Sequence, residues 1–205
     1  MARGRLITVE GLDGAGKSTL VSGLATALAE RGVALTVLRE PGGVAAAEAI
    51  RGVVADPALT IGPRAEALLF AAARAQLVEE AVAPALAAGT WVLLDRFLDS
   101  SLAYQGGGRE LGVEDVRRIN AFALGGLVPD RTLYLRIDPS TGRSRQATRG
   151  HAADRMEQAD DGFFARVAEA YDALAAAEPE RIAVLDASGE PDAVLAAALA
   201  ALDRD

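Results

Sequence analysis

The stretch Gly11-Leu12-Asp13-Gly14-Ala15-Gly16-Lys17-Ser18 matches the pattern G-x-x-x-x-G-K-[ST]. It follows directly on the apolar run Leu6 to Val9, and a pattern of helical period begins at Lys17. A strand, a glycine-rich turn and a helix in this order form a loop whose backbone N–H groups and helix N-terminus face phosphate. An ordinary glycine-rich turn is the alternative, which the register of the strand and the helix disfavours. The sequence therefore predicts a site for the phosphates of a nucleotide.

The side chains of this loop have distinct expected roles. We expect Lys17 to reach the β- and γ-phosphates as a mobile point charge and the hydroxyl of Ser18 to ligate Mg²⁺. The whole set expected to bind ATP is Gly11, Leu12, Asp13, Gly14, Ala15, Gly16, Lys17, Ser18 and Thr19. After Lys17, leucines recur four residues apart on one helical face until Gly32 ends the helix.

Further apolar runs indicate an α/β fold. The runs of strand length are Leu6 to Val9, Val33 to Leu38, Trp91 to Leu94, Thr132 to Ile137 and Ile182 to Leu185. They are nearly continuous rather than alternating, which is typical of strands covered on both faces. Segments of helical period separate them, including alanine-rich stretches in which larger apolar residues still recur. The alternation predicts a parallel sheet with helices packed on it.

Composition limits the classes of partner. The chain has 205 residues, of which 51% are hydrophobic, and this suits one domain over residues 1–205. A net charge of −8 disfavours nucleic acid or an anionic membrane as partner but admits small anions in a pocket. The absence of cysteine excludes disulfides, thiolate zinc sites and thiol nucleophiles. The first apolar run ends at Glu10, too early for a signal peptide or membrane span, so we expect a soluble cytoplasmic protein.

A second functional element is Asp95-Arg96, at the end of the run Trp91 to Leu94. An aspartate in this place is typical of the second acidic element of P-loop enzymes, which helps to hold Mg²⁺. The adjacent Arg96 is useful when the phosphoryl acceptor is itself an anion held near the γ-phosphate. A capping aspartate beside a solvated arginine is the simpler interpretation, which the upstream loop disfavours. We therefore predict metal ligation by Ser18 and Asp95, and catalytic roles for Lys17, Asp95 and Arg96.

These elements occur with others in an order that resembles the thymidylate kinase family over nearly the whole chain. The further motifs are Glu10-Gly11-Leu12-Asp13, Arg39-Glu40-Pro41-Gly42-Gly43, Phe70-x-x-x-Arg74, Ala103-Tyr104-Gln105-Gly106-Gly107, Pro129-Asp130 and Asp154-Arg155. Each is weak alone, whereas their order and spacing together are specific. The resemblance implies a three-layer P-loop NTPase fold with strand order 2-3-1-4-5 and phosphorylation of dTMP to dTDP by Mg-ATP. It also implies a homodimer, for which the apolar helix 65–87 is a candidate.

The resemblance assigns a set of residues to the acceptor dTMP. They are Asp13, Arg39, Pro41, Arg51, Phe70, Arg74, Arg96, Ser101, Tyr104 and Gln105. Phe70 would stack on thymine, and Arg74, one turn later on the same face, would donate to a base carbonyl. Without the resemblance, a core aromatic covered by an arginine stem is the favoured interpretation of this pair. Arg96 would hold the acceptor phosphate, and Tyr104 would pack where a 2′-hydroxyl would sit, which favours deoxyribose.

The segment 142–158 resembles the lid of the family. Its arginines are Arg143, Arg145, Arg149 and Arg155. A solvated face of mixed charge gives the same pattern. The loop between Gly11 and Gly16 supplies no cation, so charge in the transition state needs a donor from elsewhere, and the resemblance to a bacterial subgroup places that donor in the lid. We expect catalytic roles for Arg149 and Arg155, then Arg145, and none for His151.

The sequence disfavours three other functions. Adenylate kinases have a loop resembling Gly-x-Pro-Gly-x-Gly-Lys-Gly, whereas this chain has Asp13 for the proline and Ser18 for the last glycine. A GTP-hydrolysing switch needs Asn-Lys-x-Asp to read guanine, and this tetrapeptide does not occur. A non-catalytic binding module is disfavoured because the loop and Asp95-Arg96 are intact. The sequence thus favours a kinase that acts on a nucleoside monophosphate.

Overall fold

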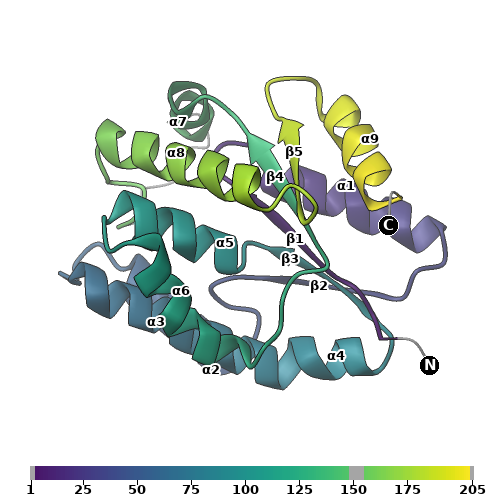
Figure 1. The fold of residues 1–205 in the computed structure, drawn as a ribbon, viewed down its shortest axis with the longest axis horizontal. Coiled ribbons are helices and arrows are strands. Elements are labelled where there is room, and N and C mark those ends of the chain that lie inside the picture. The colour runs from purple at the N-terminus through teal and green to yellow at the C-terminus, as the bar shows by residue number, and fades with distance from the viewer. Residues whose placement is uncertain (1–2, 148–154, 204–205) are drawn as a thin grey trace.

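The strands form one parallel sheet in a computed structural model that describes residues 3–147 and 155–203 (Figure 1). The sheet order is β2-β3-β1-β4-β5. The strands are β1 (Leu6–Gly11), β2 (Leu35–Arg39), β3 (Trp91–Asp95), β4 (Arg131–Arg136) and β5 (Ile182–Asp186). The predicted fold class and the order 2-3-1-4-5 are therefore confirmed. Parallel neighbours require crossovers, and each crossover here contains at least one helix.

Helices fill the connections between the strands. They are α1 (Lys17–Glu30), α2 (Ala45–Ala55), α3 (Pro63–Leu77), η1 (Val78–Val82), α4 (Ala83–Ala87), α5 (Leu98–Ser101), η2 (Leu102–Gly108), α6 (Val113–Leu124), α7 (Pro139–Ala147), α8 (Asp161–Ala177) and α9 (Pro191–Leu202). The π-helical η1 joins α3 and α4 without a break, so residues 63–87 form one long helical rod. The alanine-rich stretches are thus helical, as predicted.

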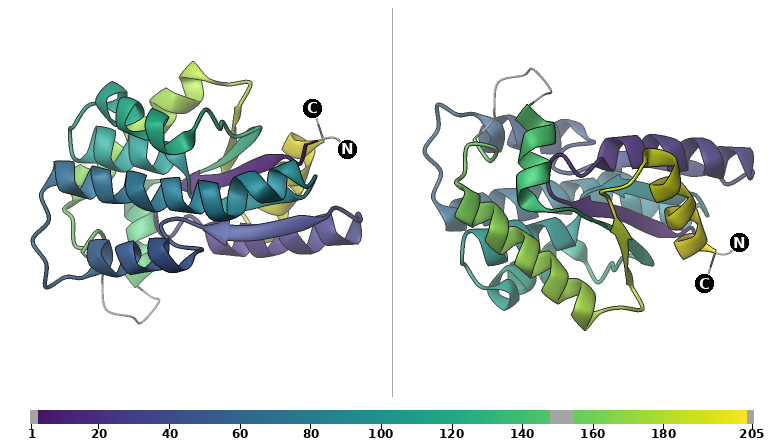
Figure 2. Two further views of the ribbon diagram at one scale, coloured as in Figure 1. Left: turned by 90° about the horizontal axis from the view of Figure 1, so that it is seen from below. Right: turned by 90° about the horizontal axis from the view of Figure 1, so that it is seen from above.

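Two groups of helices cover the faces of the sheet. α1 packs against β1, β2, β3 and α9, whereas α3, α6, η2 and α8 pack against one another in sequence. In Figure 2 (right), α1 and α9 lie on one side of the strands and α8 lies on the other. The carboxyl ends of β1 and β3 lie side by side, with Val9 opposite Asp95. This edge of a parallel sheet is the usual place for a ligand site.

The position of each strand in the sheet decides how deeply it is buried. Every residue of β1 is buried, as the continuous apolar run predicts. The edge strands depart from the prediction of cover on both faces, because Val37 of β2 is 44% exposed and Val184 of β5 is 48% exposed. An edge strand has a neighbour on one side only, so the helices cover it incompletely. β2 also begins at Leu35, later than the predicted Val33.

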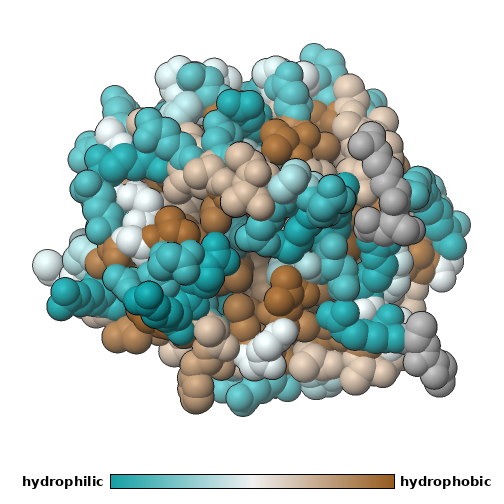
Figure 3. Space-filling model, viewed as in Figure 1, coloured by the Kyte–Doolittle hydropathy of each residue, from teal (hydrophilic) through white to brown (hydrophobic). Residues whose placement is uncertain are grey.

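The core spans the sheet and both helical layers. Its fully buried members include Leu6, Leu24, Leu93 and Leu133. Hydrophilic side chains cover most of the face shown in Figure 3. Within the described residues, no helix is both long and apolar enough to span a bilayer.

Candidate active site

The glycine-rich loop leaves β1 at Gly11 and enters α1 at Lys17. Three of its glycines have a positive φ, which is 138° at Gly11, 82° at Gly14 and 95° at Gly16. A Cβ atom on Gly14 would lie 2.1 Å from the carbonyl oxygen of Gly142 in α7. The loop therefore needs glycine both for its backbone conformation and for direct backbone contact with α7.

Lys17 lies inside this loop and is only 7% exposed. Its Nζ donates hydrogen bonds to the carbonyl oxygens of Gly11 (3.2 Å) and Leu12 (2.9 Å) and lies 3.5 Å from Oδ1 of Asp13. Burial, and then the nearby Arg96 guanidinium, lower the pKa of Lys17 to about 8 in spite of the carboxylate. The ammonium group is thus placed where the phosphates of a nucleotide are expected.

Ser18 and Asp95, the two residues predicted to ligate a metal, lie together at the ends of two neighbouring elements. The Ser18 hydroxyl donates to Oδ2 of Asp95 across 3.3 Å. This pair fits Mg²⁺, which is usually bound by one or two protein oxygens together with phosphate oxygens and water. Over residues 3–147 and 155–203, no group of three or more Asp, Glu, His or Cys side chains forms a metal site made by protein alone. A metal ion at this pair would take its other ligands from the nucleotide and water.

Arg96 joins the loop to the neighbouring strand. It has a left-handed φ of 70°, which is unusual for a residue with a side chain. Its NH2 donates to Oδ1 of Asp13 (2.6 Å) and to the hydroxyl of Tyr104 (3.3 Å), and NH1 donates to the carbonyl of Gly11 (3.0 Å). Burial alone would raise the pKa of Asp13, but the charges of Arg96 and Lys17 hold it well below its usual range. Asp13 is therefore ionised at neutral pH.

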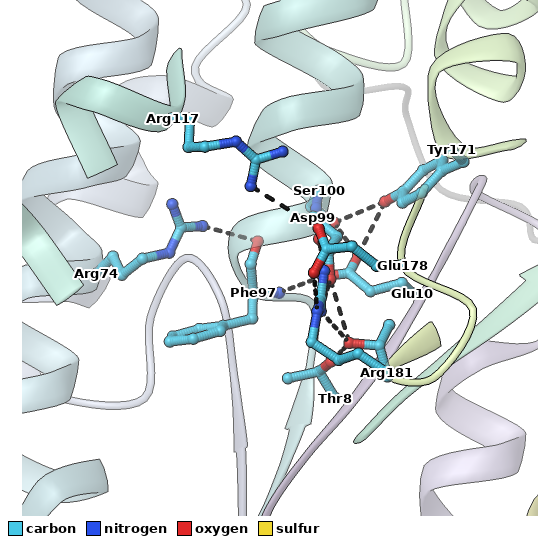
Figure 4. A network of polar contacts seen from close by, with 11 residues as sticks. Thr8, Glu10, Arg74, Phe97, Asp99, Ser100, Arg117, Tyr171, Glu178 and Arg181 are labelled. Carbon is cyan, nitrogen blue, oxygen red and sulfur yellow. Dashed lines mark hydrogen bonds and ion pairs between the residues drawn. The ribbon is translucent and has the colours of Figure 1, made fainter. Parts of the chain in front are cut away.

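A buried carboxyl group, Glu10, lies beside Ser100 and Tyr171 (Figure 4) and is linked to Arg96 through Ser100. Glu10 accepts hydrogen bonds from the backbone N–H groups of Phe97 (2.8 Å) and Ser100 (3.2 Å). It also accepts from the hydroxyls of Ser100 (2.5 Å) and Tyr171 (2.9 Å). The Ser100 hydroxyl in turn accepts from NH1 of Arg96 (3.1 Å). Glu10 thus fixes both the backbone after Arg96 and a side chain that holds its guanidinium.

Asp99 adds a second buried carboxylate to the same network. Arg181 neutralises it through two hydrogen bonds, of 2.7 Å from NH1 and 2.8 Å from NH2, and Thr132 donates a third (Figure 4). Burial, and next the charge of Asp99, raise the pKa of Glu10 to about 7, although the hydrogen bond from Ser100 lowers it. The Glu10 carboxyl group therefore titrates near neutral pH.

A cavity of about 510 Å³ opens beside the loop. Its lining includes the ten residues predicted to bind the acceptor, namely Asp13, Arg39, Pro41, Arg51, Phe70, Arg74, Arg96, Ser101, Tyr104 and Gln105. Lys17, Ser18 and Asp95 border the same cavity. The structure thus brings the phosphate loop and the expected acceptor residues around one space, and the role of each residue in binding stays a prediction.

Arg74 lies at the buried end of this cavity and is 1% exposed. Its Nε and NH2 donate to Oε2 of Glu40 across 2.9 and 2.6 Å, and NH2 also donates to the carbonyl of Phe97. Its NH1 donates to the Ser101 hydroxyl (3.0 Å) and to Asn120. An acceptor base that bonds to Arg74 must therefore share or replace one of these protein contacts. Burial raises the pKa of Glu40, against the charge of Arg74.

Arg39 and Arg51 lie at the outer part of the cavity. Arg39 pairs with Glu48 across 2.9 Å, and its side chain is 52% exposed. Arg51 donates to the carbonyl of Pro41 across 3.0 Å. Both cations therefore line the cavity while bonded to protein oxygens.

The predicted lid arginines lie apart from one another. Arg145 donates from NH1 to the carbonyl of Ala187, in the connection between β5 and α9 (2.9 Å). Arg155 instead pairs through NH1 with Oε2 of Glu66 in α3 (2.8 Å) and donates from Nε to the carbonyl of Val54 (2.8 Å). Arg149 and His151 lie outside the described residues. Of the three arginines expected to be catalytic, the two that are described, Arg145 and Arg155, thus contact different elements. Arg143 contacts a third segment, with NH1 2.8 Å from Oδ1 of Asp161.

Two buried carboxyl groups that support the site had no role in the sequence-based prediction. Glu10 and Glu66 are both fully buried, and each accepts several hydrogen bonds. A signal was present in each case, because Glu10 interrupts an apolar strand, and Glu66 shares a helical face with Phe70 and Arg74 at intervals of four residues. A charge inside an apolar pattern predicts a buried, paired group.

Comparisons with known proteins agree with this geometry. The family model described as thymidylate kinase matches residues 9–198. A thymidylate kinase of Deinococcus radiodurans is 48% identical over 204 residues, which cover 100% of this chain and 98% of the relative. A thymidylate kinase of Bifidobacterium longum is 50% identical over 198 residues, which cover 95% of each chain.

A solved structure has the same fold. The crystal structure of thymidylate kinase from Ehrlichia chaffeensis superposes with a TM-score of 0.81 at 27% identity. The superposition covers 98% of this chain and 99% of that one.

We predict that Glu10 makes stability depend on pH. The pKa of Glu10 is about 7 in the folded protein, against an ordinary value of 4.5 in the unfolded chain. The protonated group therefore makes its full contribution to the free energy of unfolding below pH 4.5, and this contribution is lost as pH rises to 7. Glu10→Gln removes this titration. The wild-type free energy of unfolding, relative to that of Glu10→Gln, should fall by up to a few kcal/mol across this window and then level off. Urea unfolding of both proteins at several pH values measures it, and a constant difference would contradict the titration.

Proposed function

The chain belongs to the thymidylate kinase family, and from this membership we propose which of its residues carry out the reaction. The enzyme phosphorylates dTMP to dTDP with ATP as co-substrate, in dTTP biosynthesis, by direct in-line transfer. One observation carries the assignment of residues. The phosphate loop, Asp95-Arg96 and the ten predicted acceptor residues all surround a single cavity.

The loop residues 11–19 bind the phosphates of ATP in this proposal. The ammonium group of Lys17 already lies inside the loop. It donates hydrogen bonds to the β- and γ-phosphate oxygens and follows the γ-phosphoryl group during transfer. Ser18 and Asp95 hold Mg²⁺, supported by their separation of 3.3 Å. When it is bound, this ion neutralises charge on the bridging phosphate oxygens.

The acceptor side relies on positioning and charge. Arg96 holds the phosphate of dTMP, and its bond to Asp13 fixes the guanidinium next to the loop. The attacking oxygen belongs to an ionised phosphate, so no strong general base is needed. Phe70 stacks on thymine and Arg74 donates to a base carbonyl, supported by their place in the cavity lining. Tyr104, fixed by Arg96 and Asp13, packs against the sugar.

The lid supplies the remaining cation. Residues 142–158 form this lid, and the chain belongs to the subgroup that has its catalytic arginine there. The support is that no Lys or Arg lies between Gly11 and Gly16. Arg149 is the first candidate, because Arg145 and Arg155 are bonded to Ala187 and Glu66.

The enzyme also forms a homodimer in this proposal. In the rod 63–87, Leu77, Val78, Val82 and Leu86 are buried within the chain, so the second half of the rod offers less free apolar surface than its sequence suggests. Two large apolar side chains remain outside, Leu68 of α3 at 57% exposed and Phe122 of α6 at 94% exposed. α3 and α6 pack against each other, and we propose that a second copy covers these two helices and buries both side chains.

Acceptor specificity tests the proposed function. Steady-state kcat/KM should be highest for dTMP, lower for dUMP, and lower by roughly 100-fold or more for CMP and AMP, because the cavity pairs an aromatic ring with fixed donors. A coupled assay of ADP formation with each monophosphate, with water alone as control, measures this. Equal use of AMP and dTMP would refute the acceptor assignment, and no ADP with any of them would refute catalysis.

Replacing a lid arginine should separate turnover from binding. We expect Arg149→Ala to lower kcat by roughly 1,000-fold, because it removes charge stabilisation specific to the transition state. Affinity for dTMP, measured by calorimetry without ATP, should change by less than about twofold. Arg118→Ala, on the exposed face of α6, serves as the matched control. Unchanged turnover in Arg149→Ala would rule out the role.

A substitution that introduces one charge on α6 tests the proposed dimer face. Phe122→Glu should shift the protein from dimer to monomer in light scattering, because it places a carboxylate in an apolar contact. Val184→Glu is the control, since Val184 is also an exposed apolar residue but lies on the edge strand β5. A monomeric wild type, or an unchanged mass for Phe122→Glu, would contradict the proposed face.

A further inference from the structure

Glu66 is a buried charge that none of the roles above uses. It lies in the first turn of α3, four residues before Phe70, and its exposure is 0%. A buried carboxylate without partners is strongly unfavourable, so its partners show what it holds in place.

The partners of Glu66 come from two segments outside its own helix. Gln105 of η2 donates to Oε1 across 2.9 Å. Arg109, just after η2, donates from Nε to Oε1 (3.1 Å) and from NH2 to Oε2 (3.2 Å). Arg155, from the segment before α8, pairs from NH1 with Oε2 across 2.8 Å. One carboxylate thus joins α3 to both of these segments.

Arg155 is held at more than one atom. Besides Glu66, its Nε donates to the carbonyl of Val54 (2.8 Å), and its backbone N–H donates to the carbonyl of Ala55 (3.2 Å). The sulfur of the next residue, Met156, lies 3.5 Å from NH2 of Arg155. These contacts attach the backbone and the side chain of Arg155 to the C-terminal end of α2.

The attached residues form part of the wall of the acceptor cavity. Val54, Ala55, Gln105, Met156 and Glu157 all line it. A displacement of Arg155 would therefore change the shape of the wall on the side of α2. It would also leave the buried carboxylate of Glu66 with one cation fewer.

We propose that Glu66 is a positioning residue that holds Arg155, and with it residues 156–157, against the wall of the acceptor cavity. In this role Arg155 acts through the shape of the dTMP site and makes no contact with the transferred phosphoryl group. The proposal rests on the function proposed above, because it takes dTMP as the occupant of the cavity. The proposal gives Arg155 a different role from Arg149, although the sequence pattern predicts a catalytic role for both arginines.

A double-mutant cycle measured by dTMP binding tests this role. Calorimetry without ATP gives the Kd for wild type, Glu66→Gln, Arg155→Met and the double variant. We expect each single change to weaken dTMP binding roughly tenfold, as for loss of a charge-assisted hydrogen bond. The Kd of the double variant for dTMP should be no higher than the higher of the two single-variant Kd values, because both changes break the same contact between Glu66 and Arg155.

Two further variants complete the test. Arg155→Lys keeps a cation for Glu66 and should recover part of the lost affinity. Asp115→Asn breaks an exposed ion pair with Arg118 on α6 and should leave the Kd for dTMP unchanged. If Glu66→Gln does not fold, Arg155→Met and Arg155→Lys still decide, because both leave Glu66 bonded to Gln105 and Arg109.

The outcomes discriminate between the two roles of Arg155. An unchanged Kd together with a fall of roughly 100-fold or more in kcat for Arg155→Met would overturn the proposal and make Arg155 a transition-state donor. Effects of Glu66→Gln and Arg155→Met that multiply in the double variant would also overturn it. Failure of the enzyme function itself is seen separately, as absence of dTDP formation by the wild type.

Discussion

The site depends on the pairing of β1 with β3 and on the buried carboxyl group that joins their ends. Parallel pairing places Val9 opposite Asp95, so the phosphate loop and Asp95-Arg96 leave the sheet side by side. Glu10 then bonds to the backbone of Phe97 and Ser100, which fixes the turn in which Arg96 adopts a left-handed conformation. Its several donors stabilise a carboxyl group that burial alone would make costly. The donor side and the acceptor side of the cavity are thus connected through one side chain.

Charges of opposite sign alternate from the loop into the cavity. Lys17 and Arg96 flank Asp13, and Arg74 neutralises Glu40 at the buried end. Each cation is therefore oriented by a protein carboxylate before any substrate binds, which lowers the reorganisation needed during transfer. A protein with a net charge of −8 can hold anionic nucleotides only where cations face them. Among the described residues, Lys17 and four arginines line this cavity.

The sequence predicts those parts of the molecule that depend on local pattern. The strands, the helix after the glycine-rich loop and the alanine-rich helices all have signals within a few neighbouring residues, and these predictions were confirmed. The strand order has no such local signal; it was expected from the resemblance to a family and was confirmed by the sheet. Incomplete cover of β2 was not predicted, because exposure of Val37 depends on which strands lie beside it. Arg155 pairs with Glu66 from a distant part of the sequence, and arginines 145, 149 and 155 look equivalent when only their spacing is known. Only the folded structure shows that Arg145 bonds to Ala187 whereas Arg155 bonds to Glu66.

The contact between Gly14 and Gly142 limits how this chain can vary. Each position faces backbone atoms of the other segment, and a Cβ on Gly142 would lie 2.8 Å from the carbonyl oxygen of Asp13. Most crowded positions in a protein can be rescued by a smaller residue across the contact. Here there is no side chain left to shorten, so neither glycine has a compensating partner. Both positions should therefore remain glycine in any library of active variants, however freely the surrounding surface changes.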